Sequence, residues 1–174
     1  MNLMKLKKYF LKSTTSTNDV AIKKIKQGLN SGIIVANKQT RGRGRYGNKW
    51  IYMKNNLFMS VFFNLSSSMN LRKLTITSCK IVKKSLFKIL KIKITIKKPN
   101  DLLINNKKVC GILQEILFYE RNKFAIIGIG VNIHTSPNIY NYPTTYLNFF
   151  TKKKINKTKV FEEIKKNFEN FLTK

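Results

Sequence analysis

The segment from Ile92 to Ile133 holds four strand-like stretches in succession, with no helical stretch between them. Isoleucine alternates with lysine or threonine in the first stretch, and the others are apolar runs bounded by turn residues such as Asn105-Asn106. The stretches lie at residues 92–97, 102–104, 109–118 and 124–133. Four strands joined by short turns imply a largely antiparallel sheet, and they depart from a strict β-α-β alternation.

The rest of the chain supplies three more strand-like stretches and three helices. The first helix begins at the cap residues Ser16-Thr17-Asn18-Asp19, and the last one follows the cap candidate Thr158. The stretches are strands at 6–11, 32–38 and 57–65, and helices at 16–28, 71–90 and 158–172. The order β-α-β-β-α-β-β-β-β-α predicts the α+β class, as a mixed, largely antiparallel sheet with helices packed on one face.

The length of 174 residues suits a single domain over residues 1–174, with a core that needs neither disulfides nor metals. Cys79 and Cys110 lie far apart and His134 is the one histidine, so we expect no disulfide framework and no metal held by His or Cys. No apolar run approaches the roughly 18 residues of a membrane span, and the N-terminus lacks the apolar segment of a signal peptide. We therefore expect a cytoplasmic protein without a membrane partner.

The formal net charge of the chain is +28, from 35 Lys and Arg against 7 Asp and Glu. Such a charge suggests nucleic acid as a partner. However, 30 of the basic residues are Lys, and Lys, Ile and Asn, all encoded by A/T-rich codons, fill 71 of the 174 positions. Compositional bias therefore explains much of the charge, and the scarce residue types become informative. Three of the five Arg lie within residues 41–45.

A glycine-rich segment, residues 39–50, cannot form regular structure because glycine interrupts it three times. It contains Arg41-Gly42-Arg43-Gly44-Arg45-Tyr46-Gly47 and ends at Trp50. Alternating glycines let backbone N–H groups point into one concavity, and planar guanidinium groups can hold carboxylate or phosphate oxygens in pairs. The segment favours an anionic ligand, with an RGG-like RNA-binding tract or an ordinary flexible loop as the alternatives.

Two further motifs lie at a strand end and within strands. Lys97-Lys98-Pro99-Asn100-Asp101 could place an ammonium against a carboxylate or hold a hydrated cation, although this sequence alone is typical of a structural turn. Gly111, Gly128 and Gly130 interrupt otherwise ideal strand sequence, which indicates the close approach of a ligand or another backbone. The pair Gly128 and Gly130 is not a dinucleotide-binding motif, because no helix follows it.

Five motifs occur in an order and at separations that are together highly specific. They are Ser16-Thr17-Asn18, Gln39 with Gly42 to Gly47 and Trp50, Lys97 with Pro99-Asn100-Asp101, Gly111-Ile112-Leu113 with Glu115, and Gly128-Ile129-Gly130-Val131-Asn132. From about residue 10 to residue 135 the chain resembles the catalytic domain of biotin–protein ligases. The resemblance implies an α+β fold related to class II aminoacyl-tRNA synthetases.

The resemblance also implies a two-step reaction. Biotin and ATP, with Mg²⁺, give biotinyl-5′-adenylate and pyrophosphate, and a lysine of a biotin carboxyl carrier protein then displaces AMP. The carrier would belong to acetyl-CoA carboxylase or a related carboxylase. Two anions, a carboxylate and an α-phosphate, must approach each other, and fixed cations lower that barrier without a nucleophilic His, Ser or Cys.

The resemblance implies a role for each motif residue. Arg43, Arg45 and Lys97 would be catalytic, and we expect residues 41–47 to become ordered on ligand binding. The biotin-binding residues would be Ser16, Thr17, Asn18, Gln39, Gly42, Arg43, Gly44, Arg45, Trp50, Lys97, Gly111 and Ile112. The nucleotide-binding residues would be Arg43, Arg45, Trp50, Asn100 and Asn132.

The chain departs from the family pattern in three ways. Lys98 stands where the family usually has Trp, and Cys110 where it has a small apolar residue. We expect the C-terminal SH3-like domain of the relatives to be absent. Fewer than twenty residues precede Ser16, so we expect no N-terminal DNA-binding domain.

Two other functions stay open on the sequence. A lipoate–protein ligase or octanoyltransferase would share the fold class, and the glycine-rich segment favours the biotin ligase over it. A basic nucleic-acid-binding module would follow from the charge, but aromatic residues do not alternate with the lysine runs as stacking platforms would, so we expect no specific nucleic-acid partner. A homodimer is left open.

Overall fold

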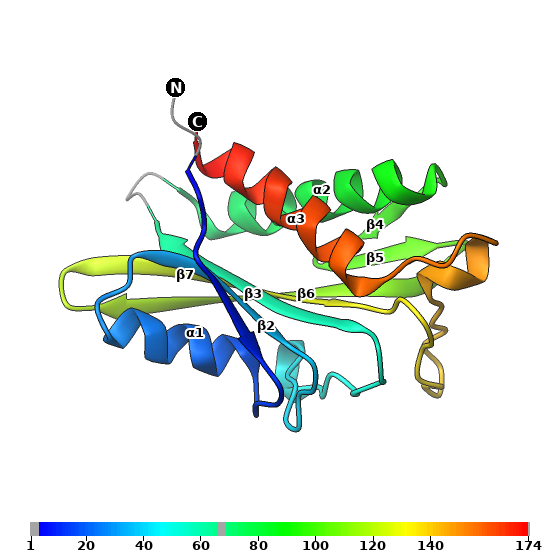
Figure 1. Ribbon diagram of the computed structural model, residues 1–174, viewed down its shortest axis with the longest axis horizontal. Helices are drawn as coiled ribbons and strands as arrows, with labels where there is room; N and C mark the ends of the chain where they lie inside the picture. The colour runs from blue at the N-terminus through cyan, green and yellow to red at the C-terminus, as the bar shows by residue number, and fades with distance from the viewer. Residues whose placement is uncertain (1–3, 66–68, 174) are drawn as a thin grey trace.

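The computed structural model describes residues 4–65 and 69–173. Within that part of the chain, seven strands form one sheet with the order β1-β2-β3-β7-β6-β5-β4 (Figure 1). The strands are β1 (Lys8–Leu11), β2 (Ser31–Ala36), β3 (Leu57–Asn64), β4 (Thr95–Lys97), β5 (Asp101–Ile104), β6 (Lys107–Tyr119) and β7 (Asn122–Val131). The helices are α1 (Thr17–Lys26), α2 (Leu71–Leu90) and α3 (Lys157–Leu172), with short 3-10 helices η1 (Arg45–Gly47) and η2 (Leu147–Phe150).

The predicted α+β class and element order are confirmed. β1 pairs with β2 in parallel, and the other neighbours are antiparallel, so the sheet is mixed and largely antiparallel. The register brings Gly111 opposite Gly130 and Asp101 opposite Gly111, so these three residues face the same side of the sheet. This shared side is where the candidate site lies.

The predicted placement of all helices on one face is wrong. α2 and α3 cover one face of the sheet, and α1 covers the other (Figure 1). The reason is that the central strands are apolar on both sides: every residue from Leu57 to Phe63 is buried, and in β2 Ile33 belongs to the α2/α3 core whereas Ile34 packs with α1. A strand buried on both faces needs cover on both faces. We call the two faces the α1 side and the α2/α3 side.

Several predicted boundaries change, and two of these changes have a clear structural reason. The strand expected over 92–97 is shorter, because α2 ends in a left-handed residue, Lys91 (φ 56°), and β4 begins only at Thr95. The cap of α3 is Asn156 rather than Thr158, since the Asn156 side chain accepts a hydrogen bond from the Lys159 N–H at 2.9 Å. The first residue of a helix depends on which side chain reaches the free N–H groups of the first turn, and here Asn156 and Thr158 are both candidates.

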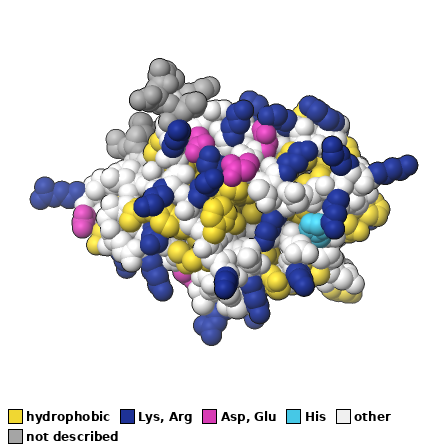
Figure 2. All heavy atoms as spheres, in the orientation of Figure 1, with side chains coloured by type: hydrophobic (Ala, Val, Ile, Leu, Met, Phe, Trp, Pro, Cys, Tyr) yellow, Lys and Arg dark blue, Asp and Glu magenta, His cyan; other side chains and the backbone are white. Residues whose placement is uncertain are grey.

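The charge on the surface is strongly positive. In the view of Figure 2, Lys and Arg side chains are spread over the face, and most of the few acidic side chains in view gather over α3, with another at the far left end. Glu162, Glu163 and Glu169 are the acids of α3, and each lies within ion-pair distance of a lysine. None of the helices in the described residues combines the length and the apolar character that crossing a membrane requires.

Candidate active site

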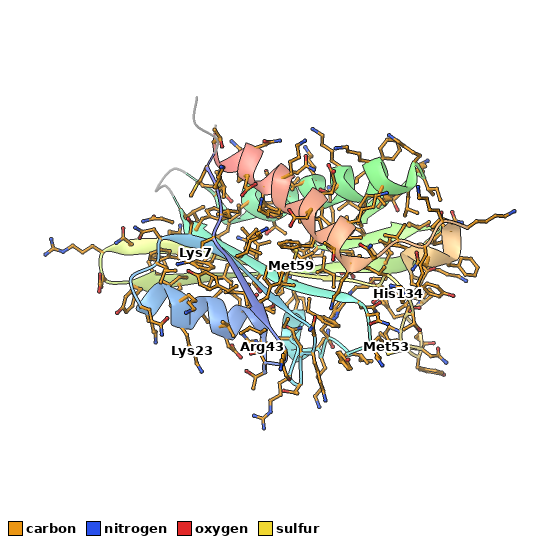
Figure 3. The ribbon with its side chains drawn as sticks, viewed as in Figure 1. Lys7, Lys23, Arg43, Met53, Met59 and His134 are labelled. Carbon is orange, nitrogen blue, oxygen red and sulfur yellow. The ribbon has the colours of Figure 1, made fainter. Side chains whose placement is uncertain are left out.

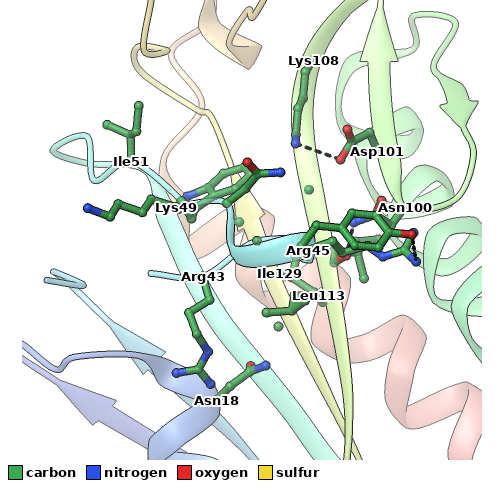
Figure 4. Close-up of a pocket in the computed structure, with 18 of the residues that line it drawn as sticks. Asn18, Arg43, Arg45, Lys49, Ile51, Asn100, Asp101, Lys108, Leu113 and Ile129 are labelled. Carbon is green, nitrogen blue, oxygen red and sulfur yellow. Dashed lines mark hydrogen bonds and ion pairs between the residues drawn. The ribbon is translucent and has the colours of Figure 1, made fainter. Parts of the chain in front are cut away.

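A pocket of about 680 Å³ opens on the α1 side of the sheet, next to the first turn of α1. Its walls come from that turn, the segment 43–51, the β4–β5 turn, β6 and β7 (Figure 4). This volume is typical of pockets that bind small molecules. Twelve of the predicted site residues line it. They are Ser16, Thr17, Asn18, Gln39, Arg43, Gly44, Arg45, Trp50, Lys97, Asn100, Gly111 and Ile112.

Two predicted site residues do not line the pocket. Gly42 lies behind Trp50, where a Cβ would come within 2.8 Å of the Trp50 carbonyl oxygen. Asn132 is 3% exposed and makes structural contacts: its Nδ2 donates to the Thr145 carbonyl at 3.2 Å, and its Oδ1 accepts from Asn56 at 3.3 Å. Both residues hold the surrounding loops together.

The floor of the pocket is made of glycine. Trp50 lies over Gly111 and Gly130 so closely that a Cβ at Gly130 would sit 2.5 Å from Trp50 Cζ2, and one at Gly111 would sit 2.6 Å from Cζ3. No side chain fits between the strands and the indole. What approaches the strand glycines is therefore a side chain, where the sequence analysis expected a ligand or another backbone.

One end of the pocket is a buried polar network. Gln39 Oε1 accepts from the Thr17 N–H at 2.7 Å and from the Thr17 hydroxyl at 2.9 Å, which leaves the Gln39 amide nitrogen as a donor. Ser60 Oγ lies 2.7 Å from Thr17 Oγ1 and 2.5 Å from Asn18 Oδ1. Ser16 occupies the N-cap position of α1 without a side-chain capping bond. We call Ser16, Thr17, Asn18, Gln39 and Ser60 the polar end.

Ser60 belongs to the polar end although the sequence analysis did not single it out. It lies in the apolar strand β3 and is fully buried. Opposite it in β7 is Gly128, where a Cβ would meet Asn18 Oδ1 at 2.6 Å. The one available signal was a hydroxyl inside an otherwise apolar strand, because a buried hydroxyl needs a hydrogen-bonding partner.

Arg43 joins the glycine-rich loop to the polar end (Figures 3 and 4). Its Nη1 lies 2.7 Å from Asp19 Oδ1, and its Nη2 lies 3.2 Å from Glu115 Oε1. The Asn18 side-chain amide also donates to Glu115. Burial alone would lower the pKa of Arg43, but its hydrogen bonds and charge pairing with Asp19 and Glu115 raise it overall. The guanidinium thus stays charged and is held by two carboxylates.

The other end of the pocket is rich in cations. Lys108 Nζ lies 2.9 Å from Asp101 Oδ1 and 5.4 Å from the Trp50 ring centroid. The Tyr142 hydroxyl donates to Asp101 Oδ2 at 2.6 Å, and the Lys97 ammonium lies 4.4 Å from the Tyr142 ring centroid. Burial and Asp101 together raise the pKa of Tyr142, so it remains a donor at neutral pH. We call Lys97, Asp101, Lys108 and Tyr142 the cationic end.

Lys108 is a further functional candidate that the sequence analysis missed. Strand alternation from Gly111 places Val109 on the pocket side and Lys108 on the α2/α3 side. The structure has the reverse, because Leu102 pairs with Cys110 while Leu103 pairs with Lys108, which leaves Val109 as an extra residue in β6. This bulge buries Val109 in the α2/α3 core and directs Lys108 into the pocket.

Arg45 and Asn100 lie between the two ends (Figure 4). The Arg45 guanidinium stacks on Tyr46, 4.8 Å from the ring centroid, and its Nη2 donates to the Tyr46 hydroxyl at 3.1 Å. It is not tied to a carboxylate within the described residues. The Asn100 amide donates to the Ile112 carbonyl at 2.7 Å and so fixes the turn beside the floor. Of the two arginines that line the pocket, Arg43 and Arg45, Arg45 is therefore the one available to an anion.

Comparison with known proteins shows that this chain is similar to ligases. The biotin/lipoate A/B protein ligase family matches residues 10–132. The bifunctional ligase/repressor BirA of Bacillus subtilis is 34% identical over 156 residues, which cover 81% of this chain and 47% of BirA. The chain thus spans about half the length of this relative.

Solved structures are similar over nearly the whole chain. Biotin protein ligase from Leishmania major in complex with biotinyl-5-AMP superposes with a TM-score of 0.81 at 25% identity, over 96% of this chain and 75% of that one. Biotin protein ligase from Aquifex aeolicus in complex with biotin and ATP gives a TM-score of 0.81 at 29% identity, over 96% and 70%.

Proposed function

Because the chain belongs to the biotin/lipoate A/B protein ligase family, we propose that it is an ATP-dependent biotin–protein ligase. It would activate biotin to biotinyl-5′-AMP and transfer the biotinyl group to a lysine of a biotin carboxyl carrier protein. The observation that carries this proposal is the pocket itself, in which a buried, uncharged polar end and a cationic end face each other across a glycine floor. Biotin has matching ends, a cyclic urea and a carboxylate.

The polar end suits the urea ring. A urea offers two N–H donors and one carbonyl acceptor. The polar end presents the Asn18 amide oxygen as an acceptor, held from behind by the Ser60 hydroxyl, together with the free amide nitrogen of Gln39. These groups are buried, so a ligand that left them unpaired would be penalised by their desolvation. Trp50 would supply an apolar wall for the sulfur ring and the carbon chain.

The cationic end suits the chemistry of activation. In the first step a carboxylate oxygen attacks the α-phosphorus of ATP and pyrophosphate leaves. Lys108, Lys97 and Arg45 would neutralise the two anions as they approach. Lys108 is half-buried over the floor, whereas Lys97 is exposed, and charge pairing is stronger where water is excluded. We therefore assign Lys108 the larger part beside the predicted Lys97.

Transfer requires no nucleophile from the protein. The lysine amine of the carrier attacks the acyl carbonyl of the adenylate, and AMP leaves with the bonding electrons. Mg²⁺ would enter with the ATP phosphates, because the described residues hold no group of three or more His, Cys, Asp or Glu that could bind a metal by itself.

Biotin-dependent exchange of pyrophosphate into ATP tests the first step directly. We expect Lys108→Ala to lower the exchange rate about 100-fold or more, the range for removing one electrostatic contact to the transition state. Lys97→Ala and Arg45→Ala should lower the exchange rate less than Lys108→Ala does. A biotin mass increment on an added carrier domain tests the second step. Full-rate exchange in all these variants would contradict the site, and adenylation of lipoate but not biotin would contradict the substrate.

A further inference from the structure

The rim of the pocket exposes apolar side chains from two loops. Tyr46 comes from the glycine-rich segment, Ile51 follows that segment directly, and Ile139 comes from the loop that also carries Tyr142. These three residues line the pocket, and Tyr140 follows Ile139 in the chain. Their exposed fractions are large, at 88% for Tyr46 and 91% for Tyr140. Monomeric proteins keep such groups of exposed apolar residues small, and a group at the edge of a pocket marks an interaction site.

The same rim is cationic. Lys49 and Lys98 line the opening and are exposed, and neither forms an ion pair with any of the described residues. Acids could have neutralised them, but the acids of the pocket are already used: Asp19 and Glu115 hold Arg43, and Asp101 holds Lys108. We call Tyr46, Lys49, Ile51, Lys98, Ile139 and Tyr140 the rim surface.

We propose that the rim surface docks an acidic protein domain, which presents its lysine from a face where carboxylates surround an apolar patch. The proposal rests on the proposed function and names the chemistry of its partner. An attacking amine must come within about 3–3.5 Å of the acyl carbon. Because the floor is closed by the sheet, the amine has to enter through the rim.

The residue types of the rim surface fit this task. Tyrosine buries a large apolar area at low conformational cost and is enriched among the residues that carry binding energy. Uncompensated lysines around it steer an acidic partner and reject a basic one. A carrier face with an apolar patch and acids beside its lysine therefore complements the rim in both apolar character and charge.

Tyr140→Ser is the main test, since Tyr140 does not line the pocket. We expect the KM for a purified carrier domain to rise about tenfold, the effect of truncating an aromatic interface residue, with biotin-dependent exchange unchanged. Phe118→Ser is the matched control: Phe118 is 73% exposed but lies at the β6–β7 hairpin, away from the rim. It should change neither measurement.

A second variant tests the charge. Lys49→Glu should lower kcat/KM for the carrier at low salt and weaken its dependence on salt, because surface charge pairs are screened by ions. A carrier variant with lysines in place of the acids beside its target lysine should be a poor substrate for the wild-type protein and a better one for Lys49→Glu.

The outcomes separate the two proposals. If the wild-type protein shows no biotin-dependent exchange, the proposed function fails. If exchange is normal and Tyr140→Ser and Lys49→Glu leave the carrier kinetics unchanged, the docking surface is wrong and the function stands. Tight binding of a single-stranded oligonucleotide that Tyr140→Ser abolishes, without any change in carrier kinetics, would assign the rim to nucleic acid and also overturn the docking proposal.

Discussion

β7 presents two different surfaces on the same side of the sheet. Its residues on the α1 side are, in order, Phe124, Ile126, Gly128 and Gly130. The first two pack under α1 with Phe62 of β3, and the last two lie under the pocket. We call these parts the filled half and the open half. Strand geometry is the same in both halves, so the difference lies in side-chain volume alone.

The two halves show how the fold makes a binding site without a cleft between domains. The α2/α3 side supplies a continuous core behind both halves, including Ile127 and Ile129 of β7 itself. Burial on the α2/α3 side therefore stabilises the sheet even though half of the α1 side lacks side chains. Trp50 occupies part of the space released and leaves the rest for a ligand.

Removing a large side chain from the filled half should lower the free energy of unfolding the most. Phe62 is fully buried, and Phe62→Ala should lower the free energy of unfolding by about 3–5 kcal/mol, as Phe truncations in cores do. Ser60→Ala, two residues away in the open half, should cost only about 1–3 kcal/mol, from the partners it leaves unpaired, while weakening biotin binding. Urea unfolding and calorimetric titration with biotin would measure both, and equal stability losses at the two positions would erase the distinction between the halves.

Adding a side chain to the open half should affect ligand binding rather than folding. In Gly130→Val the new side chain must displace Trp50, so we expect biotin binding to weaken about 100-fold, equivalent to about 2.7 kcal/mol. Ile126→Val in the filled half is the control and should cost about 0.5–1.5 kcal/mol of stability with unchanged binding. Tight biotin binding by Gly130→Val would mean that the ligand does not use this floor.

Glu115 stands at the border, because it pairs with Ile126 of the filled half and contacts Arg43 above the open one. Glu115→Ala leaves Asn18 and Arg43 without their shared acceptor, so we expect the KM for biotin to rise about tenfold, or 1.4 kcal/mol. Glu115→Gln keeps an acceptor oxygen and should recover most of this loss. Exchange kinetics at varied biotin would measure the effect, and an equal loss in both variants would point to charge rather than hydrogen bonding.

The sequence predicted the filled half better than the open one. Apolar alternation located the strands and helices, because burial acts on every residue of an element. It also singled out Gly111, Gly128 and Gly130 as positions of close approach, although the approaching groups are the side chains of Trp50 and Asn18. It could not place Lys108, since the bulge at Val109 reverses the alternation and depends on how β5 and β6 pair. Nor could it show that Asp19 and Glu115 hold Arg43, because that contact joins three separate segments.

The smallest effect is expected on the α2/α3 side, where Cys110 adjoins Gly111 in sequence but faces the other way. Burial, above all, raises the pKa of the Cys110 thiol, and burial followed by the charge of Asp101 raises the pKa of Cys79 from 9.0 to about 11. Thiolates are the reactive form, so alkylation of the folded protein at pH 8 should be slow at both cysteines and unaffected by biotin.

The same shift sets a pH dependence with a definite sign. The folded-state pKa of Cys79 lies above its unfolded value, so the protonated thiol contributes stability that is present below about pH 9 and is lost as the pH rises through about 11. Cys79→Ala should remove that part of the alkaline loss of stability, as measured by urea unfolding at several pH values. Alkylation of the native protein at the rate of a free thiol would contradict the burial of the two cysteines. Protection that appears only with biotin would mean that the ligand reaches through to the α2/α3 side, and the separation between the two faces of the sheet would then fail.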